Sequence, residues 1–311
     1  MSWVLIAVIS YFIFAIGNIG DKFLLDKYIT SSKTYAFLIS LFSLAVFLLS
    51  PWFLEWPGWT LFFYNVLIGA LAPIAMLLMY KALKEGEASQ IITIIGATVP
   101  IFTLLLSISF LGEHFSGRQW LALSFLVLGA IVFSGIPQAH DLWHKVQAWF
   151  SVESINHRLG VASAIAAAFV FALFFIGSKY LYSQQGFMSA FIWLRLGTAL
   201  VSILILVPAE YRQEIFDGIR KIKSRRVRSF FLVNQLVGGG GFLLQNYAIA
   251  LGSVAIVNAL QGVQYVSLLI LTSVMSIFYP RALQEKISRS ILRNKLFAIV
   301  LIVVGLYLVV S

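Results

Sequence analysis

Three polar side chains lie close together inside one long apolar stretch of this chain. Asn258, Gln261 and Tyr265 are spaced by three and four positions, which places them on one face of a helix. Amide and phenol groups are costly against lipid, so at membrane depth they face a cavity or bond to neighbouring helices. The first interpretation makes this face a binding surface for a polar solute, the second makes it a set of interhelical hydrogen bonds, and both stay open.

A second apolar stretch carries amides at its two ends and glycines between them. Asn234, Gly238, Gly241 and Gln245 share one helix face, and the glycines belong to a run of four, residues 238–241. Small residues in a membrane helix usually permit close approach of a neighbouring helix, and they also permit bending. We include Asn234 and Gln245 among the candidate solute-binding residues.

Cationic side chains within the apolar stretches form a third group of candidates. Lys22 and Lys179 lie near the ends of their stretches, where long basic side chains usually reach the headgroups, although a pair guarding a central path is the alternative. Arg195 lies about nine residues into its stretch, too deep for that, so it needs a partner, a water-filled cavity or an anionic solute. Weaker candidates flank the turn between two other stretches: Tyr80, Lys81 and Gln90.

Carboxylates are missing from the middle of every apolar stretch. Asp21 lies close to an end, and Glu113 and Glu285 lie at or beyond ends. Proton-coupled export of hydrophobic cations depends on a membrane-embedded carboxylate and is therefore disfavoured. The embedded charges are cationic, which favours an anionic or zwitterionic solute.

Residue patterns for other chemistries are absent from the sequence. There is no cysteine, hence neither a disulfide framework nor a thiolate metal site. His140 and His144 are four positions apart, but an interfacial amphipathic stretch explains them better than a metal site does. No nucleophile-elbow, Walker or paired-carboxylate pattern occurs, so we expect no enzyme, no cofactor and no metal.

The composition explains what must position these residues. The chain is 60% hydrophobic and 11% charged, whereas a soluble domain carries roughly a quarter charged residues. Continuous apolar stretches of 18 or more residues predict membrane-spanning helices rather than barrel strands. We count ten, at 3–25, 34–54, 60–83, 88–111, 118–136, 159–182, 187–207, 230–251, 253–278 and 292–310. The start of the chain shows no cleavable signal peptide, so we interpret it as the first span.

The distribution of positive charge predicts the orientation. Of 22 Lys and Arg residues, 17 fall in or beside the odd-numbered connections between spans, and the opposite side clearly holds only Arg118. The positive-inside rule therefore places the odd connections in the cytoplasm and both termini outside. The basic run 221–228 is then a lipid-headgroup anchor, and a nucleic-acid partner is not expected.

The chain also repeats itself. Phe12, Gly20 and Lys22 recur 157 positions later as Phe169, Gly177 and Lys179. Further pairs are Gly86 with Gly252 and Gly96 with Gly262 at an offset of 166, and Gly129 with Gly305. Five spans per half is an odd number, so the second half enters the membrane in the opposite direction, as in transporters built from inverted repeats.

Residues 80–133 resemble the second part of an EamA repeat of the drug/metabolite transporter superfamily. The matching positions are Tyr80, Ala82, Leu83, Ala88, Ser89, Pro100, Leu111, Gly112, Glu113 and Gly129. The resemblance covers the chain as two copies, 1–136 and 159–311, joined by 137–158. It implies an all-α polytopic membrane protein with ten helices in two inverted five-helix repeats.

Several positions depart from the family pattern. In the second copy Val266 stands at the proline position and Gln284 replaces the glycine before Glu285. The family's second-helix arginine is matched by Arg195, but its first-copy counterpart is Leu38. The connection between spans two and three has no basic residue, so either this chain is inserted the other way round from relatives or the side assignment fails.

The resemblance implies a secondary transporter that works by alternating access. We expect an amino acid or other zwitterionic or anionic solute, export, and a prokaryotic inner membrane. A lipid-linked or sugar-phosphate substrate and a scaffold without transport remain alternatives. One chain supplies both halves of a pathway, so a monomer suffices, and a dimer stays open.

Overall fold

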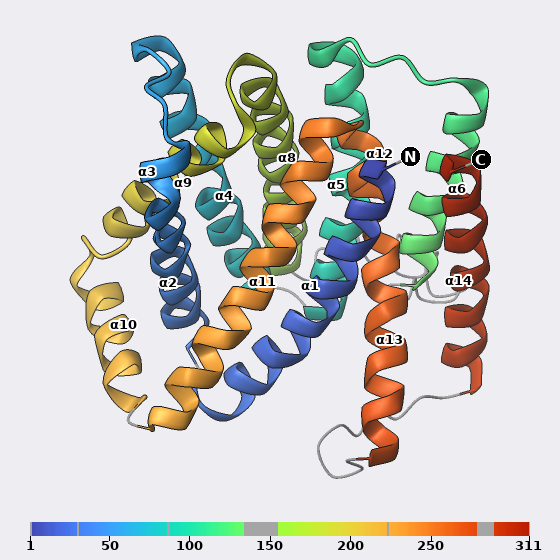
Figure 1. Ribbon diagram of the computed structural model, residues 1–311. Coiled ribbons are helices and arrows are strands. Elements are labelled where there is room, and N and C mark those ends of the chain that lie inside the picture. Colours follow the sequence, from blue (N-terminus) through green and yellow to red (C-terminus); the bar gives the residue numbers. More distant parts are fainter. Residues whose placement is uncertain are drawn as a thin grey trace. The chain divides into compact units, whose positions relative to one another are not determined.

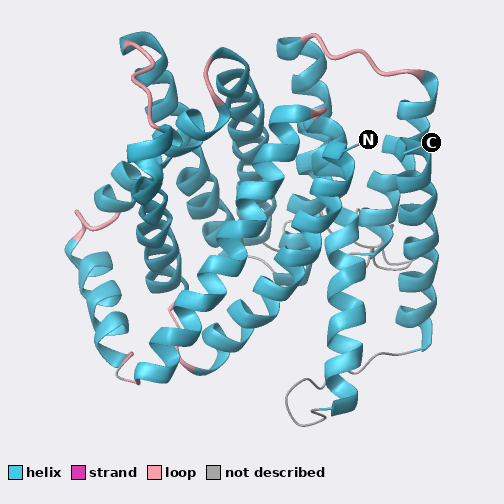
Figure 2. Cartoon of the chain, in the orientation of Figure 1, coloured by secondary structure: helices cyan, strands magenta, loops and turns pink. Residues whose placement is uncertain are grey.

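The structure, a computed structural model, describes residues 2–29, 31–85, 88–133, 155–222, 224–278 and 289–310. Figure 2 shows helices joined by short connections in these ranges, without a strand. Most of the predicted linker 137–158 lies outside the described residues, as do His140, His144, Gln284 and Glu285.

The helices follow the order of the predicted apolar stretches (Figure 1). Their bounds are α1 Ser2–Lys27, α2 Ser32–Ser43, the 3-10 helix η1 Leu44–Leu49, α3 Ser50–Phe53, α4 Trp59–Glu85, α5 Ala88–Leu111, α6 Gly117–Phe133, α8 Ile155–Gln184, α9 Phe187–Leu204, α10 Ala209–Lys221, α11 Arg225–Leu251, α12 Val254–Ala259, α13 Gln261–Phe278 and α14 Arg289–Val310. The second predicted span is thus α2, η1 and α3 in succession, and the ninth is α12 followed by α13.

Nine spans in the described part of the chain are long and apolar enough to cross a membrane. α6 is the tenth apolar helix, and its 17 residues fall just below the 18 that define the others. A helix of this length rises about 26 Å, close to the thickness of a bilayer core. The prediction of an all-α integral membrane protein with ten apolar helices is therefore confirmed.

The described residues form two compact units. The first unit contains residues 2–76 and 173–252, and the second unit contains residues 77–172 and 253–310 together with the chain ends. Each unit combines helices from both halves of the chain. The compact units are defined by contacts in space and the repeats by similarity along the sequence, so the units do not test the repeats. The division into repeats at 1–136 and 159–311 stays a prediction.

Helix pairing inside each unit follows the order expected of an inverted duplication. In the first unit α1 packs along α11 and α2 packs against α9, while in the second unit α6 packs along α14 and α5 against α12. The pairs α2 with α9, α5 with α12 and α6 with α14 each join a helix to its counterpart in the other half of the chain.

Two glycine contacts of the first unit occur at positions that the sequence repeat makes equivalent. A Cβ added to Gly20 of α1 would overlap the side chain of Asn234 in α11. A Cβ added to Gly177 of α8 would approach the side chain of Ile68 in α4 to 2.9 Å. Gly177 follows Gly20 by 157 positions and Asn234 follows Ile68 by 166, the two offsets found in the sequence. The same close approach therefore occurs twice.

A pair of ring contacts repeats in the same way. Phe23 packs edge to face on Phe230 with centroids 5.5 Å apart, and Tyr64 packs on Tyr180 at 6.5 Å. Tyr180 is the counterpart of Phe23 at offset 157, and Phe230 is the counterpart of Tyr64 at offset 166. Aromatic pairs add specificity to helix packing beyond the area that they bury. The duplicated packing agrees with the offsets that the sequence shows.

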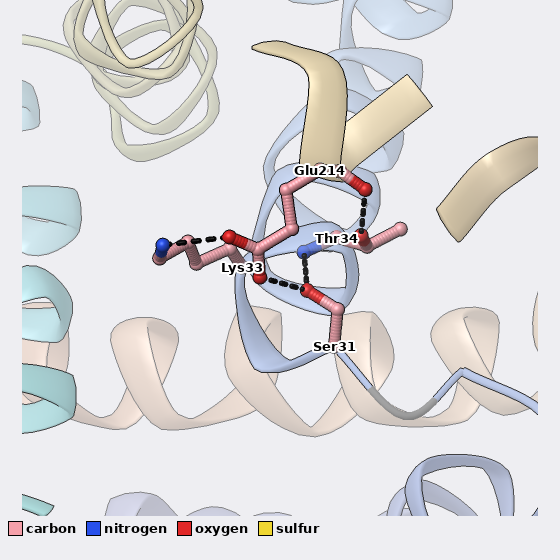
Figure 3. A network of polar contacts seen from close by, with 4 residues as sticks. All are labelled: Ser31, Lys33, Thr34 and Glu214. Carbon is pink, nitrogen blue, oxygen red and sulfur yellow. Dashed lines mark hydrogen bonds and ion pairs between the residues drawn. The ribbon is translucent and has the colours of Figure 1, made fainter. Parts of the chain in front are cut away.

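α10 was not predicted, because the sequence analysis expected only a long connection between the seventh and eighth spans. Its carboxylate Glu214 accepts hydrogen bonds from Ser31 Oγ at 2.8 Å and Lys33 Nζ at 2.7 Å, and its carbonyl accepts one from Thr34 at 3.4 Å (Figure 3). Ile215 is fully buried beside it. These contacts place the first-to-second and seventh-to-eighth connections at the same end of the first unit, as alternation of spans requires.

Candidate functional site

Arg195 occupies the centre of an aromatic cluster in the first unit. Its side chain is 5% exposed, and its guanidinium carbon lies 4.9 Å from the ring centroid of Phe191 and 4.9 Å from that of Phe242. Phe191 is one turn earlier on α9, so it shares the helix face of Arg195, whereas Phe242 comes from α11. The two rings stand 6.0 Å apart. They hold the guanidinium from α9 and α11.

Two of the three nitrogens of this guanidinium lack hydrogen-bond partners among the described residues. Nε and Nη2 of Arg195 are both buried, and neither has a partner among the described residues. Guanidinium N–H groups are strong obligate donors, and a buried donor without a partner costs about 1–3 kcal/mol. Faces of aromatic rings offset part of that cost by cation–π attraction, but they accept no conventional hydrogen bond. The site therefore has donors to offer to an anion.

Tyr182 and Asn246 fix the helices around this cluster. The Tyr182 hydroxyl of α8 donates to Asn246 Oδ1 of α11 at 2.9 Å, and Asn246 Nδ2 donates to the carbonyl of Phe242 at 2.8 Å. Phe187, at the start of α9, packs on Tyr182 with centroids 5.0 Å apart. Residues from α8, α9 and α11 thus hold Arg195 in place by contacts that leave its own donors unused. Arg195 was predicted from the sequence, but the aromatic and amide partners were not.

The candidate amides of α11 bond to α1. Gln245 Nε2 donates to the Tyr11 hydroxyl at 3.0 Å, and Asn234 Nδ2 donates to Asp21 Oδ1 at 2.5 Å and to the Gly17 carbonyl at 3.3 Å. A role in solute binding for Asn234 and Gln245 stays a prediction, since interhelical bonding was the alternative interpretation.

The α11 glycines differ among themselves. A Cβ on Gly241 would reach backbone and side chains of α1 at 3.3 Å, whereas one on Gly239 would meet nothing within 4 Å. A Cβ on Gly17 of α1 would touch the Cα of Gly238 at 3.5 Å. Close approach of α1 and α11 therefore explains Gly241, whereas a Cβ on Gly238 or Gly240 would, like one on Gly239, meet nothing within 4 Å.

The ninth-span candidates belong to the second unit. The helix is interrupted at Leu260, so Asn258 lies on α12 while Gln261 and Tyr265 lie on α13. Asn258 is 2% exposed, and the Tyr265 ring stacks on Phe133 of α6 with centroids 5.8 Å apart. Gln261 is half-buried. Their role toward a solute stays a prediction.

The Tyr265 hydroxyl reaches α5 at a glycine. A Cβ added to Gly96 would lie 2.5 Å from the Tyr265 oxygen, so this residue has to lack a side chain for the tyrosine to occupy its place. Gly96 was recognised in the sequence only as a repeat mate of Gly262. Its contact with Tyr265 gives it a packing role in the second unit.

The remaining cationic and polar candidates do not share the contacts described for Arg195. Lys179 donates to the carbonyls of Ile249, Ala250 and Gly252 at 2.9, 3.0 and 2.9 Å, which stabilises the C-terminus of α11. Its repeat mate Lys22 is exposed. Of the weaker candidates, Lys81 is exposed, Tyr80 is half-buried and Gln90 lies outside the described side chains.

Comparison with known proteins agrees with the sequence resemblance. Residues 1–135 match the model of the EamA-like transporter family, which belongs to the drug/metabolite transporter superfamily. Residues 1–135 are EamA-like. The predicted resemblance is therefore confirmed over this part of the chain, and it agrees with a membrane transporter.

A solved crystal structure has a similar fold. It superposes with a TM-score of 0.66 over 99% of this chain and 96% of that one, at 17% sequence identity. Identity this low shows a shared fold alone. No curated protein matches the sequence.

The EamA-like segment uses its Leu-Gly-Glu motif to join helices. Gly112 has φ +64°, a left-handed conformation that glycine adopts without strain, and it ends α5. Glu113 then accepts hydrogen bonds from Ser253 Oγ at 2.6 Å and from the Val254 backbone at 3.3 Å. A carboxylate at a helix N-terminus is stabilising, so Glu113 helps to fix the start of α12. The motif therefore has a packing role in the second unit.

One polar residue that the sequence analysis set aside lies in a hydrogen-bonded network. Asp21 of α1 accepts hydrogen bonds from Tyr35 of α2 and Asn234 of α11, although it lies within a span of 23 residues that ends at Leu25. Its position near the end of the span made it look like an interfacial group. Its partners are on other helices and distant in sequence, so no local pattern could have revealed them.

Proposed function

We propose that this protein is a secondary transporter that moves a small zwitterionic or anionic solute by alternating access, with Arg195 binding the acidic group of the solute. The supporting observation is the buried guanidinium whose Nε and Nη2 have no partner among the described residues. A charged group at membrane depth persists when it serves a function, because lipid and apolar packing alone oppose it.

The geometry of Arg195 suits a planar anion. A guanidinium binds carboxylate through two parallel N–H···O bonds, and each charge-assisted bond contributes about 1.5–3 kcal/mol. The flanking rings of Phe191 and Phe242 contact the guanidinium from two helices, which limits its movement before a solute arrives. An amino acid or other small carboxylate is therefore our first expectation. A sugar phosphate presents comparable acceptors and is the second.

Orientation and direction form part of the same proposal. We propose that the odd-numbered connections, which include α10, face the cytoplasm of a prokaryotic cell and that both termini lie outside. Export is the expected direction. A monomer supplies both repeats and is the expected working form. Cysteine labelling of a single engineered site in α10, such as Gln213→Cys, from each side of sealed vesicles tests the orientation.

Counterflow in proteoliposomes tests the transport function. Purified protein is reconstituted with internal unlabelled solute, and uptake is followed for labelled amino acids, organic anions, nucleotide sugars and organic cations. Arg195→Ala and Arg195→Lys are compared with Arg220→Ala, a matched control because the Arg220 side chain is 81% exposed.

We expect saturable uptake of a carboxylate-bearing solute by the wild type and the control. Loss of two charge-assisted bonds amounts to about 3 kcal/mol or more, hence about a 100-fold weaker apparent affinity for Arg195→Ala. Arg195→Lys keeps the charge but loses the planar pair of donors and should recover only part of the affinity. Absence of counterflow for every solute would contradict the transporter proposal, and uptake of cations alone would contradict the role of Arg195.

A further inference from the structure

Asp21 is a carboxylate within a membrane span that has polar partners on two other helices, α2 and α11. Its Oδ1 accepts a hydrogen bond from the Tyr35 hydroxyl and one of 2.5 Å from Asn234 Nδ2. Gln235 Nε2 in turn donates to the Tyr35 oxygen at 3.2 Å, and Asn234 also donates to the Gly17 carbonyl at 3.3 Å. α1, α2 and α11 are therefore joined through one ionisable group.

The surroundings of this network are apolar. Tyr35 belongs to a buried cluster with Leu24, Ile29, Val227 and Phe231, and the Phe231 ring packs edge to face on Tyr35 at 5.9 Å. Such surroundings lower the local dielectric and strengthen the effect of a charge on its neighbours. Asp21 itself is half-buried, so water at that end of the span still reaches it.

No cation neutralises this carboxylate in the part of the chain that the structure describes. Lys33 of α2 forms its ion pair with Glu214, and the charged residues nearest in sequence on α1 and α11 are exposed: Lys22, Lys27, Arg225, Arg226 and Arg228. Tyr35 is the titratable group in direct contact with Asp21. A carboxylate in a membrane helix without a neighbouring cation is costly, and such residues commonly carry ions or protons.

We propose that Asp21 is a proton-binding site that couples solute movement to a proton gradient. The inference builds on the proposed transport function and adds the coupling ion. It differs from the cation-export mechanism that the sequence disfavours, because solute binding is assigned to Arg195 and proton binding to a separate carboxylate.

Protonation changes the strength of the hydrogen bonds that Asp21 accepts from the neighbouring helices. The charged carboxylate accepts from Tyr35 and Asn234 at once, and charge-assisted bonds are about twice as strong as neutral ones. Both bonds end on Oδ1, so a proton on Oδ2 removes the negative charge and thereby weakens the bond from the Tyr35 hydroxyl and the bond from the Asn234 amide. The links from α1 to α2 and α11 are then looser. Proton binding thus biases the packing of α11, the helix that contributes Phe242 to the Arg195 cluster.

Gly20 allows this network to lie close to α11. A Cβ there would overlap the Asn234 side chain, so the amide could not remain beside Asp21. The repeat counterpart of this contact pairs Gly177 with Ile68, and Asp21 itself is matched by Ser178. The ionisable group therefore exists in one half only, which suits a single proton-binding site per chain.

Two measurements test the proposal, and the first needs no solute. Infrared difference spectra of the purified full-length protein, recorded during a pH titration, should show a protonated carboxyl band that disappears in Asp21→Asn. Asp217→Asn is the matched control, since the Asp217 side chain is 49% exposed, and it should keep the band. A band that persists in Asp21→Asn would overturn the assignment whether or not the protein transports a solute.

The second measurement uses proteoliposomes with the pH dye pyranine inside and a mixture of labelled L-amino acids outside. We expect solute-driven proton movement in wild type, and a ratio of gradient-driven accumulation to counterflow that falls at least tenfold in Asp21→Asn. Counterflow without proton movement in wild type would overturn the proposal and leave the transport function standing. Accumulation driven by a sodium gradient in place of a proton gradient would overturn it as well.

Tyr35→Phe provides an independent variant if Asp21→Asn fails to fold. It removes one donor to the charged carboxylate while keeping the ring that packs on Phe231, so the pH midpoint of proton movement should rise. A purely structural role would lower the amount of folded protein but would leave this midpoint unchanged, and an unchanged midpoint would count against the proposal.

Discussion

Replacing Arg195 with methionine is expected to make the protein more stable and unable to bind its solute. Methionine is unbranched and apolar, and it fills the space between Phe191 and Phe242 without donors to satisfy. The Arg195 side chain is 5% exposed, so water contributes little at this position in the folded wild type or in the folded variant. Stability and binding should therefore change in opposite directions.

The magnitude follows from two opposing contributions. Two buried nitrogens without partners cost about 1–3 kcal/mol each, about 2–6 kcal/mol together. The two ring contacts at 4.9 Å stabilise the guanidinium by about 0.5–2 kcal/mol each, about 1–4 kcal/mol together. The difference favours methionine by about 1–2 kcal/mol in the free energy of unfolding, which corresponds to a rise of a few degrees in Tm.

Thermal unfolding in detergent, followed by intrinsic tryptophan fluorescence, measures the effect with and without solute. Saturating solute at 100 times its Kd should stabilise wild type by about 2.7 kcal/mol and should leave Arg195→Met unchanged. Arg220→Met, at an exposed position, should change neither value. A methionine variant less stable than wild type by 1 kcal/mol or more would refute the argument, because it would mean that Arg195 has a structural partner.

Three further substitutions and one control substitution test the packing. Lys179→Met removes a cation from three carbonyls at the end of α11 and should cost about 2–4 kcal/mol of stability without weakening solute affinity, as denaturant titration and counterflow will show. Gly20→Ala should destabilise by about 1–3 kcal/mol through overpacking against α11, whereas Gly239→Ala, which meets nothing within 4 Å, should be neutral or slightly stabilising. Glu214→Gln should lower Tm by less than the equivalent of about 1 kcal/mol, because the pair is partly exposed, yet it should speed tryptic cleavage after the basic residues of α10; equal cleavage rates would argue against the docked position of that helix.

Local patterns in the sequence were sufficient for the helices and their membrane class. Uninterrupted apolar stretches predicted ten spans, since hydrophobicity and length are properties of neighbouring residues. α10 was missed because an amphipathic helix with several charges has neither feature. The family resemblance also came from local motif residues, and Gly112 shows why such a motif persists, since its positive φ restricts the residue type.

The repeat offsets predicted more than the sequence analysis drew from them. The offsets 157 and 166 relate Gly20 and Asn234 to Gly177 and Ile68, so each contact could have been inferred from the other. What the offsets cannot supply is which helix faces which. That depends on how four or five helices bury their surfaces together, an energy that no single segment carries.

For the candidate site too, some features follow from the sequence and others from the tertiary structure. Arg195 stood out in the sequence because an arginine deep in an apolar stretch is costly wherever the helix packs. Its missing hydrogen bonds and its two ring contacts were decided by the tertiary structure, because Phe242 is 47 positions away on another helix. Asp21 shows the reverse case: the sequence placed it near a helix end, and the packing of α1 against α2 and α11 gave it hydrogen-bond partners on both of those helices. Composition and spacing thus determined which groups enter the membrane, whereas tertiary packing decided which of them found partners, because partners for a buried polar group come from other helices.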